Sequence, residues 1–135
     1  MRTISIPALL LAVTSVVSAP LLLVSCQTQA DAIATDLSPL EFFQKAQEAS
    51  DSGNYRLAIE YYTAFRQKYP EHVDRNLWAS YEIAFLYHKL GDDETALDLF
   101  SKLIDRYAQA DANQLPQGPL ILSEKVRDAI EDHTS

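Results

Sequence analysis

The chain repeats its own pattern at an offset of 38 residues, and this repeat is the strongest constraint on its fold. The shift places small and apolar residues on small and apolar residues, while the polar residues between them are unrelated. The matched pairs are Ala46 and Ala84, Gly53 and Gly91, Ala58 and Ala96, Tyr62 and Phe100, Phe65 and Leu103, and Tyr69 and Tyr107. Self-similarity at periods of roughly 20 to 50 residues indicates stacked supersecondary units. We therefore expect two copies of one structural unit.

Each copy contains two helical patterns that are separated by a glycine. The expected helices cover residues 39–52, 54–69, 75–90 and 92–107. Apolar side chains recur at steps of three and four in the second helix of each copy, which is one helix face. Gly53 and Gly91 are expected to end the first helices, because the residue after the last turn often needs a left-handed backbone. The sequence thus predicts an all-α fold of two helical hairpins, with small alanines where the helices cross.

The borders of this repeat region carry their own signals. Ser38, Pro39 and Glu41 form the pattern of a capping box with proline at the first helical position. Residues 109–119 contain two prolines and a glycine and are expected to be a loop. Residues 120–133 are expected to form a C-terminal capping helix whose apolar face holds Leu122, Val126, Ala129 and Ile130. The two repeats then occupy residues 38–108.

Two stretches resemble the tetratricopeptide repeat. "GNYRLAIEYYTAFRQKYP" has Gly53, Tyr55, Ala58, Tyr62 and a closing Pro70 at the spacing of that motif. "YEIAFLYHKLGDDETALDLFSKLIDRY" supplies a second copy with Ala84, Tyr87, Gly91, Ala96 and Phe100, and has Ala108 in place of the closing proline. The resemblance covers residues 39–108. It implies a protein-binding array in which the first helix of each unit lines a groove.

The resemblance places one aromatic stripe at groove-facing positions of the second repeat. The stripe consists of Trp78, Tyr81, Phe85 and His88, at steps of three and four along one helix. Phe43 is the aromatic residue at the corresponding positions of the first repeat. Aromatic side chains dominate binding hot spots, so these five residues are the predicted partner-binding site. The alternative is that the stripe packs on the first repeat or beneath the C-terminal helix.

The N-terminal segment predicts export and lipid attachment. Residues 1–25 combine Arg2 with an uncharged apolar run, which is typical of a signal peptide. Pro7 and Pro20 interrupt this run and disfavour the rival interpretation of a membrane-anchoring helix. Residues 23–26, Leu-Val-Ser-Cys, resemble the bacterial lipobox and contain the only cysteine of the chain, Cys26. The resemblance implies that Cys26 receives a diacylglyceryl group and becomes the acylated first residue of the mature chain. Residues 26–37 would then form a flexible tether.

Composition narrows the function classes. The net charge of −8 argues against nucleic-acid binding and against broad adhesion to anionic lipid headgroups. The chain has only three glycines, no metalloprotease motif, and dispersed histidines (His72, His88 and His133), so we expect no enzyme, no cofactor and no metal site. Two repeats are fewer than the roughly three that usually make a stable array. Docking to a partner protein or self-association is therefore expected.

Lipobox and repeats together resemble the outer-membrane assembly lipoproteins of the BamD type, whose longer repeat units also end in Lys-Tyr-Pro, as at residues 68–70. That resemblance implies a scaffold on the periplasmic face of the outer membrane that works with a barrel-inserting partner. Such proteins typically have about five repeats and this chain has two recognisable ones. Two alternatives stay open: an adaptor of a transporter or secretion complex, and a periplasmic solute-binding component. A solute-binding protein should show an enclosed pocket around Trp78 and Phe85, and an adaptor an open groove.

Overall fold

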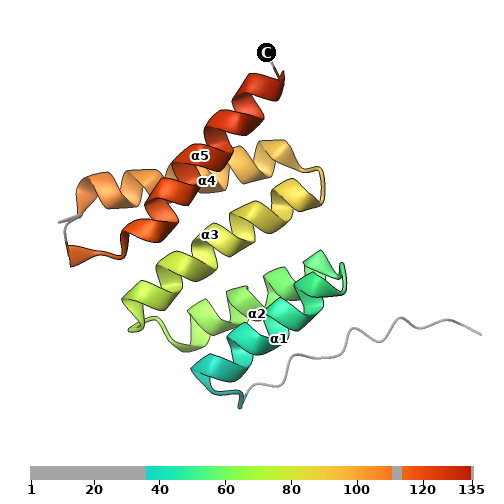
Figure 1. Ribbon diagram of the computed structural model, residues 1–135. Helices are drawn as coiled ribbons and strands as arrows, with labels where there is room; N and C mark the ends of the chain where they lie inside the picture. Colours follow the sequence, from blue (N-terminus) through green and yellow to red (C-terminus); the bar gives the residue numbers. More distant parts are fainter. Residues whose placement is uncertain (1–35, 111–113, 135) are drawn as a thin grey trace, which may run out of the picture. The chain divides into compact units, whose positions relative to one another are not determined.

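The computed structural model describes residues 36–110 and 114–134, and this part of the chain consists of helices joined by short turns (Figure 1). The helices are α1 (Pro39–Asp51), α2 (Tyr55–Lys68), α3 (Val73–Lys89), α4 (Asp93–Gln109) and α5 (Gln117–Thr134). The predicted all-α fold of two helical hairpins and a C-terminal helix is confirmed.

The turns inside the two hairpins have the same construction. Gly53 and Gly91 both adopt φ of 78°, the left-handed conformation that glycine reaches without a steric cost. In each turn the residue after the glycine, Asn54 or Asp92, is the N-cap of the following helix. Its side chain accepts a hydrogen bond from the main-chain N–H group three residues later. The repeated sequence thus produces a repeated turn, as the glycine positions predicted.

The first helix begins with the expected capping box. The main-chain N–H of Ser38 donates to the Glu41 carboxylate at 2.8 Å, and the N–H of Glu41 donates to the Ser38 hydroxyl at 3.4 Å. The Ser38 hydroxyl also donates to the Glu41 carboxylate, at 2.6 Å, and the donations from the hydroxyl and the main chain of Ser38 lower the pKa of Glu41. Pro39 occupies the first helical position, where a main-chain N–H group would have no acceptor within the helix, so proline loses no hydrogen bond there.

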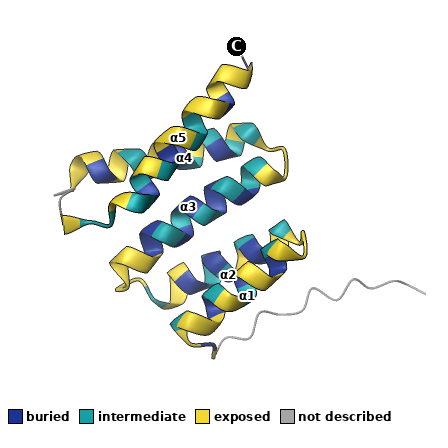
Figure 2. Ribbon diagram, viewed as in Figure 1, coloured by how far each residue is buried: buried dark blue, intermediate teal, exposed yellow. Residues whose placement is uncertain are grey.

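Each helix packs against the next one in the chain, and α5 contacts both α4 and α3. The four alanines at the predicted crossing points, Ala46, Ala58, Ala84 and Ala96, are fully buried. Side chains of the buried faces form two apolar clusters. The buried residues are dark blue on the ribbons of Figure 2. The first cluster contains Leu37, Phe42, Ala46, Ala49, Ala58, Tyr62, Phe65, Ala79, Ile83 and Leu86. The second contains Leu77, Tyr81, Ala84, Ala96, Phe100, Leu103, Tyr107 and Ile130.

Packing begins one residue before the predicted border of the repeats. Leu37 was assigned to the tether, but its side chain is only 9% exposed and belongs to the first cluster. Its carbonyl oxygen accepts hydrogen bonds from the Tyr69 hydroxyl at 2.8 Å and from Lys68 Nζ at 3.2 Å. The residue before the capping box therefore covers part of the α1–α2 hairpin.

The C-terminal helix also differs from its expected bounds and face. It begins at Gln117 rather than at residue 120, because Pro119 lies in the first turn, where no intrahelical N–H bond is required. The Tyr107 hydroxyl donates to the carbonyl of Pro116 at 2.6 Å and fixes the approach to α5. Ile130 is buried as expected, whereas Ala129 is exposed, and buried Ser123 completes the inner face instead.

Candidate functional site: the hollow between α1 and α3

A hollow of about 440 Å³, open to solvent, lies between the first helices of the two hairpins. Its lining residues are Phe43, Gln44 and Gln47 of α1, Tyr62 of α2, and Trp78 and Glu82 of α3. Two of the five predicted partner-binding residues, Phe43 and Trp78, therefore meet at one surface depression. We call this feature the α1/α3 hollow.

Phe43 is held in place by aromatic packing on its inner side. Its ring meets those of Tyr62 and Phe65 edge-on, with centroids 5.2 and 4.9 Å away. The Arg75 guanidinium lies 5.8 Å from the same ring, a cation–π distance. A ring fixed in this way loses little further conformational entropy when a partner packs on it.

Trp78 connects the α1/α3 hollow to the C-terminal helix. Its indole ring lies so close to Gly118 of α5 that a Cβ atom at Gly118 would be 2.6 Å from Cζ2. On its own helix the ring meets Tyr81 edge-on at a centroid distance of 6.2 Å. The position of α5 therefore determines how much of Trp78 remains available to the hollow.

Glu82 supplies the only carboxylate among the residues that line this hollow. Burial raises the pKa of Glu82, because the apolar surroundings disfavour the ionised form. The neighbouring Tyr62 has its pKa raised by burial and, to a smaller extent, by the charge of Glu82. Both shifts indicate that this side of the hollow is less polar than the open surface.

The rest of the aromatic stripe does not line the hollow. Tyr81 is only 8% exposed and belongs to the second cluster, where it stacks on Phe85 at 6.0 Å and approaches Phe100 at 6.1 Å. Phe85 is partly buried against the same cluster. His88 Nδ1 lies 2.6 Å from a carboxylate oxygen of Asp93 in the next helix. A binding role for Tyr81, Phe85 and His88 stays a prediction.

Sequence reasoning missed Gln44, Tyr62 and Glu82. Glu82 follows Trp78 by four residues, so helical spacing places both on one side of α3, a signal that was available in the sequence. Tyr62 was identified only as part of the buried face of its helix, and it is buried there while its edge also reaches the hollow.

The described residues were also searched for a metal site and for a membrane-spanning helix. Across residues 36–110 and 114–134, no group of three or more His, Cys, Asp or Glu side chains is arranged to hold a metal ion. None of the helices in these ranges is both long and apolar enough to cross a membrane. The predicted signal peptide at residues 1–25, the lipidation site Cys26 and the tether up to residue 35 lie outside the described residues.

The tetratricopeptide repeat family model matches residues 42–72 and 78–110. The first match spans α1 and α2, and the second begins at Trp78 and ends after α4. No curated protein and no solved structure matches the chain. The chain therefore carries two tetratricopeptide repeats, and the α1/α3 hollow lies between their first helices.

Proposed function

We propose that this two-repeat protein is a lipid-anchored scaffold that binds a segment of a partner protein in the α1/α3 hollow. The observation that carries the proposal is the meeting of Phe43 from the first repeat with Trp78 from the second at one open depression. Tetratricopeptide repeats are typical of adaptors in protein–protein interaction, and rigid aromatic rings provide large contact areas at low entropic cost.

The lining of the hollow favours a partner segment with an apolar and a basic side chain. The two rings offer apolar contacts, and the carboxylate of Glu82 offers an ion-pairing acceptor. Gln44 and Gln47 add amide groups that can hydrogen-bond to a main chain. The net charge of −8 of the whole chain attracts basic segments over a longer range.

The proposed cellular setting rests on the N-terminal sequence. Lipidation at Cys26 would place the repeats at a membrane surface, and Gln27 in the following position favours the periplasmic face of the outer membrane. Assembly of outer-membrane proteins is the leading role, and an adaptor role in a transporter or secretion complex is the alternative. The open form of the α1/α3 hollow favours either adaptor role over a solute-binding one.

Site-specific photocrosslinking in membranes tests this proposal. A photoreactive amino acid at Gln47, an exposed residue that lines the hollow, should capture the partner. The same amino acid at Glu60, an exposed residue of α2 that does not line the hollow, is the control. Adducts with a barrel-assembly protein from Gln47 alone would support the leading role, and adducts with a permease would support the alternative.

Substitution of Glu82 examines the chemistry of the same contact. In Glu82→Gln the shape of the hollow is kept and the negative charge is removed, so the crosslinking yield from Gln47 should fall severalfold for a basic partner. Equal yields from Gln47 and Glu60 in the unsubstituted chain would show that no partner occupies the α1/α3 hollow.

A further inference from the structure

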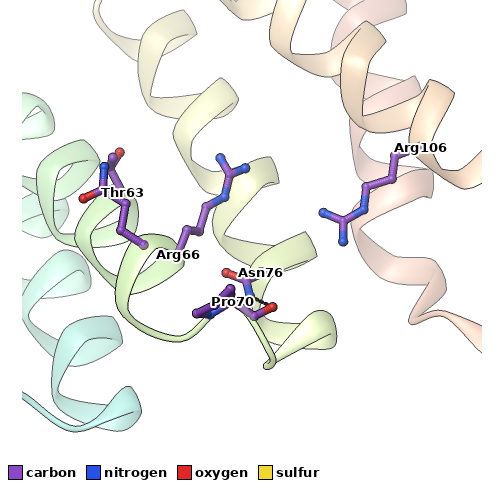
Figure 3. A pocket seen from close by; sticks show the side chains of 6 residues that line it. Thr63, Arg66, Pro70, Asn76 and Arg106 are labelled. Carbon is purple, nitrogen blue, oxygen red and sulfur yellow. Dashed lines mark hydrogen bonds between the residues drawn. The ribbon is translucent and has the colours of Figure 1, made fainter.

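Two exposed aliphatic side chains lie where the chain enters the repeats. Leu40, in the first turn of α1, is 57% exposed, and Val73, the first residue of α3, is 42% exposed. Pro39 precedes Leu40, and the exposed Pro70 lies in the turn before α3 (Figure 3). We call these four apolar residues the entry surface.

The alternating direction of the helices brings the parts of the entry surface to one end of the first hairpin. α1 and α3 begin and α2 ends there, whereas the turns inside the two hairpins lie at the opposite end (Figure 1). Contacts between the helices hold this arrangement. The Tyr69 hydroxyl, at the end of α2, donates to the carbonyl of Leu37 at 2.8 Å, and the Arg75 guanidinium, in the first turn of α3, lies 5.8 Å from the ring of Phe43 on α1.

Leu37 determines where the predicted tether joins the folded repeats. Its side chain is buried, and its carbonyl oxygen also accepts a hydrogen bond from Lys68 Nζ at 3.2 Å. The eleven residue steps from Cys26 to Leu37 span at most about 40 Å, even in a fully extended chain. A lipid at Cys26 would therefore keep the entry surface closer to the bilayer than the opposite end of the hairpin, because α1, with 13 residues, adds about 20 Å between the two ends.

The charge of this end neither attracts nor strongly repels a bilayer. Its charged residues are four acids and two bases, namely Asp36, Glu41, Lys68, Glu71, Asp74 and Arg75. They account for only a small part of the net charge of −8. A contact with lipid headgroups must then come chiefly from the apolar side chains, since burial of one aliphatic side chain stabilises a contact severalfold or more.

The small area of the entry surface favours a bilayer over a second copy of the chain. Four side chains are far from the roughly 800 Å² per partner that a stable protein interface requires. A weak contact is sufficient at a bilayer, because a tether of this length raises the local concentration of the two surfaces to about the millimolar range.

We propose that the entry surface contacts the bilayer that carries the lipid anchor, with Leu40 and Val73 inserted among the headgroups. This inference rests on the lipid attachment at Cys26 that belongs to the proposed function. It adds an orientation to that function. Phe43 follows Leu40 by about one turn of α1, so the contact fixes how the α1/α3 hollow is presented above the membrane.

Methyl NMR with a spin-labelled lipid measures this contact. The full-length chain is produced in bacteria, purified from membranes, and placed on phosphatidylcholine nanodiscs that contain a lipid with a nitroxide headgroup. If mass spectrometry shows acylated Cys26, its own lipid is the anchor, and if it shows a free thiol, Cys26 is coupled to a maleimide lipid in the same nanodiscs. The methyl signals of Leu40 and Val73 should be attenuated severalfold more than those of Leu90, which is 37% exposed at the other end of α3.

Substitutions separate a contact from the proximity that the tether alone imposes. The methyl signals of Leu37 report on this end of the hairpin without being part of the entry surface. In the double variant Leu40→Ser and Val73→Ser their attenuation should fall severalfold, because two aliphatic side chains no longer enter the headgroup region. Leu90→Ser is the matched control and should leave the attenuation of Leu37 unchanged. All three positions are exposed, so the variants should keep the helical circular dichroism of the parent.

Two results would overturn the proposal. The first is equal attenuation of Leu37 in the parent and in the double variant. The second is stronger attenuation on phosphatidylglycerol nanodiscs than on phosphatidylcholine nanodiscs, which would assign the contact to the charges of Lys68 and Arg75. A free thiol at Cys26 in the purified chain would instead contradict the lipid anchor of the proposed function, and the coupled chain would still measure the contact.

Discussion

Glu82 is the residue whose ionisation most directly links the α1/α3 hollow to stability. Burial raises its pKa above the ordinary value of 4.5, so the folded chain holds this proton more tightly than the unfolded chain does. The folded state is therefore favoured at low pH, and this contribution is lost as the pH rises from about 4.5 through the folded pKa.

Glu82→Gln should remove this loss of stability at high pH, because glutamine does not ionise. We expect the variant to match the parent near pH 4 and to be more stable than the parent at pH 8, as measured by urea unfolding at each pH. Glu60→Gln, at an exposed position of the neighbouring helix, should show no such divergence. A constant difference between Glu82→Gln and the parent at all pH values would contradict the assigned cause.

Gly118 is required for the close contact between α5 and Trp78. A Cβ atom at this position would lie 2.6 and 2.7 Å from two atoms of the indole ring, so Gly118→Ala must displace the ring. We expect a loss of about 1 to 3 kcal/mol in the free energy of unfolding, typical of an overpacked contact. Because Trp78 is the only tryptophan, its emission spectrum should shift in the folded variant. Ala129→Ser, on the exposed side of α5, should change neither quantity.

Individual helices show how local sequence determines local structure. The turn between α3 and α4 needs a left-handed residue at position 91, and a Cβ atom there would meet open space. Gly91→Ala should therefore cost only the backbone strain, about 1 to 2 kcal/mol by chemical denaturation. Gly91→Asn should cost less, because asparagine tolerates this conformation better. Equal losses for both variants would indicate that the turn, rather than residue 91, absorbs the change.

The elements that were predicted correctly are those with local signals. Capping residues, turn glycines and the spacing of apolar residues act within one or two turns of helix, and the bounds of α1 to α4 follow them closely. Leu37 escaped prediction because its burial depends on Tyr69 and Lys68, which lie one helical hairpin away in the sequence. The early start of α5 escaped it because proline usually marks a loop and here occupies a first turn.

The sites were predicted only in part, for a related reason. Phe43 and Trp78 came from repeat positions, and the structure brings both to the α1/α3 hollow. Arg66 and Arg106 line a second hollow, on α2, α3 and α4 (Figure 3), but they do not occupy equivalent repeat positions, since Arg106 aligns with Lys68. Their proximity follows from the packing of α2, α3 and α4, which no local pattern encodes.

In the molecule as a whole, the two apolar clusters are joined rather than independent. Tyr87 of α3 and Leu99 of α4 are partly buried and pack against both clusters, so these two side chains connect the clusters. Arrays of this type gain stability from interfaces between neighbouring units. The first cluster is extended by Leu37 and the second is covered by α5 through Ile130. Both ends of this two-repeat array therefore have cover from outside the repeats.

Ile130 tests whether α5 acts as a cap that is coupled to the repeats. Its side chain is 2% exposed in the second cluster, so Ile130→Ala should cost about 2 to 4 kcal/mol in the free energy of unfolding. Urea unfolding is followed by Trp78 fluorescence, which senses the contact with α5, and by circular dichroism, which senses all helices. In the parent the two transitions should coincide, because neighbouring interfaces are shared. In Ile130→Ala the fluorescence transition should come first, since α5 loses its main buried anchor while the first cluster stays intact. Ile121→Ala, at a largely exposed position of α5, is the control.

Coincident transitions in Ile130→Ala would show instead that α5 and the two repeats unfold as one unit. The α1/α3 hollow beside Trp78 would then exist only when the entire array is folded.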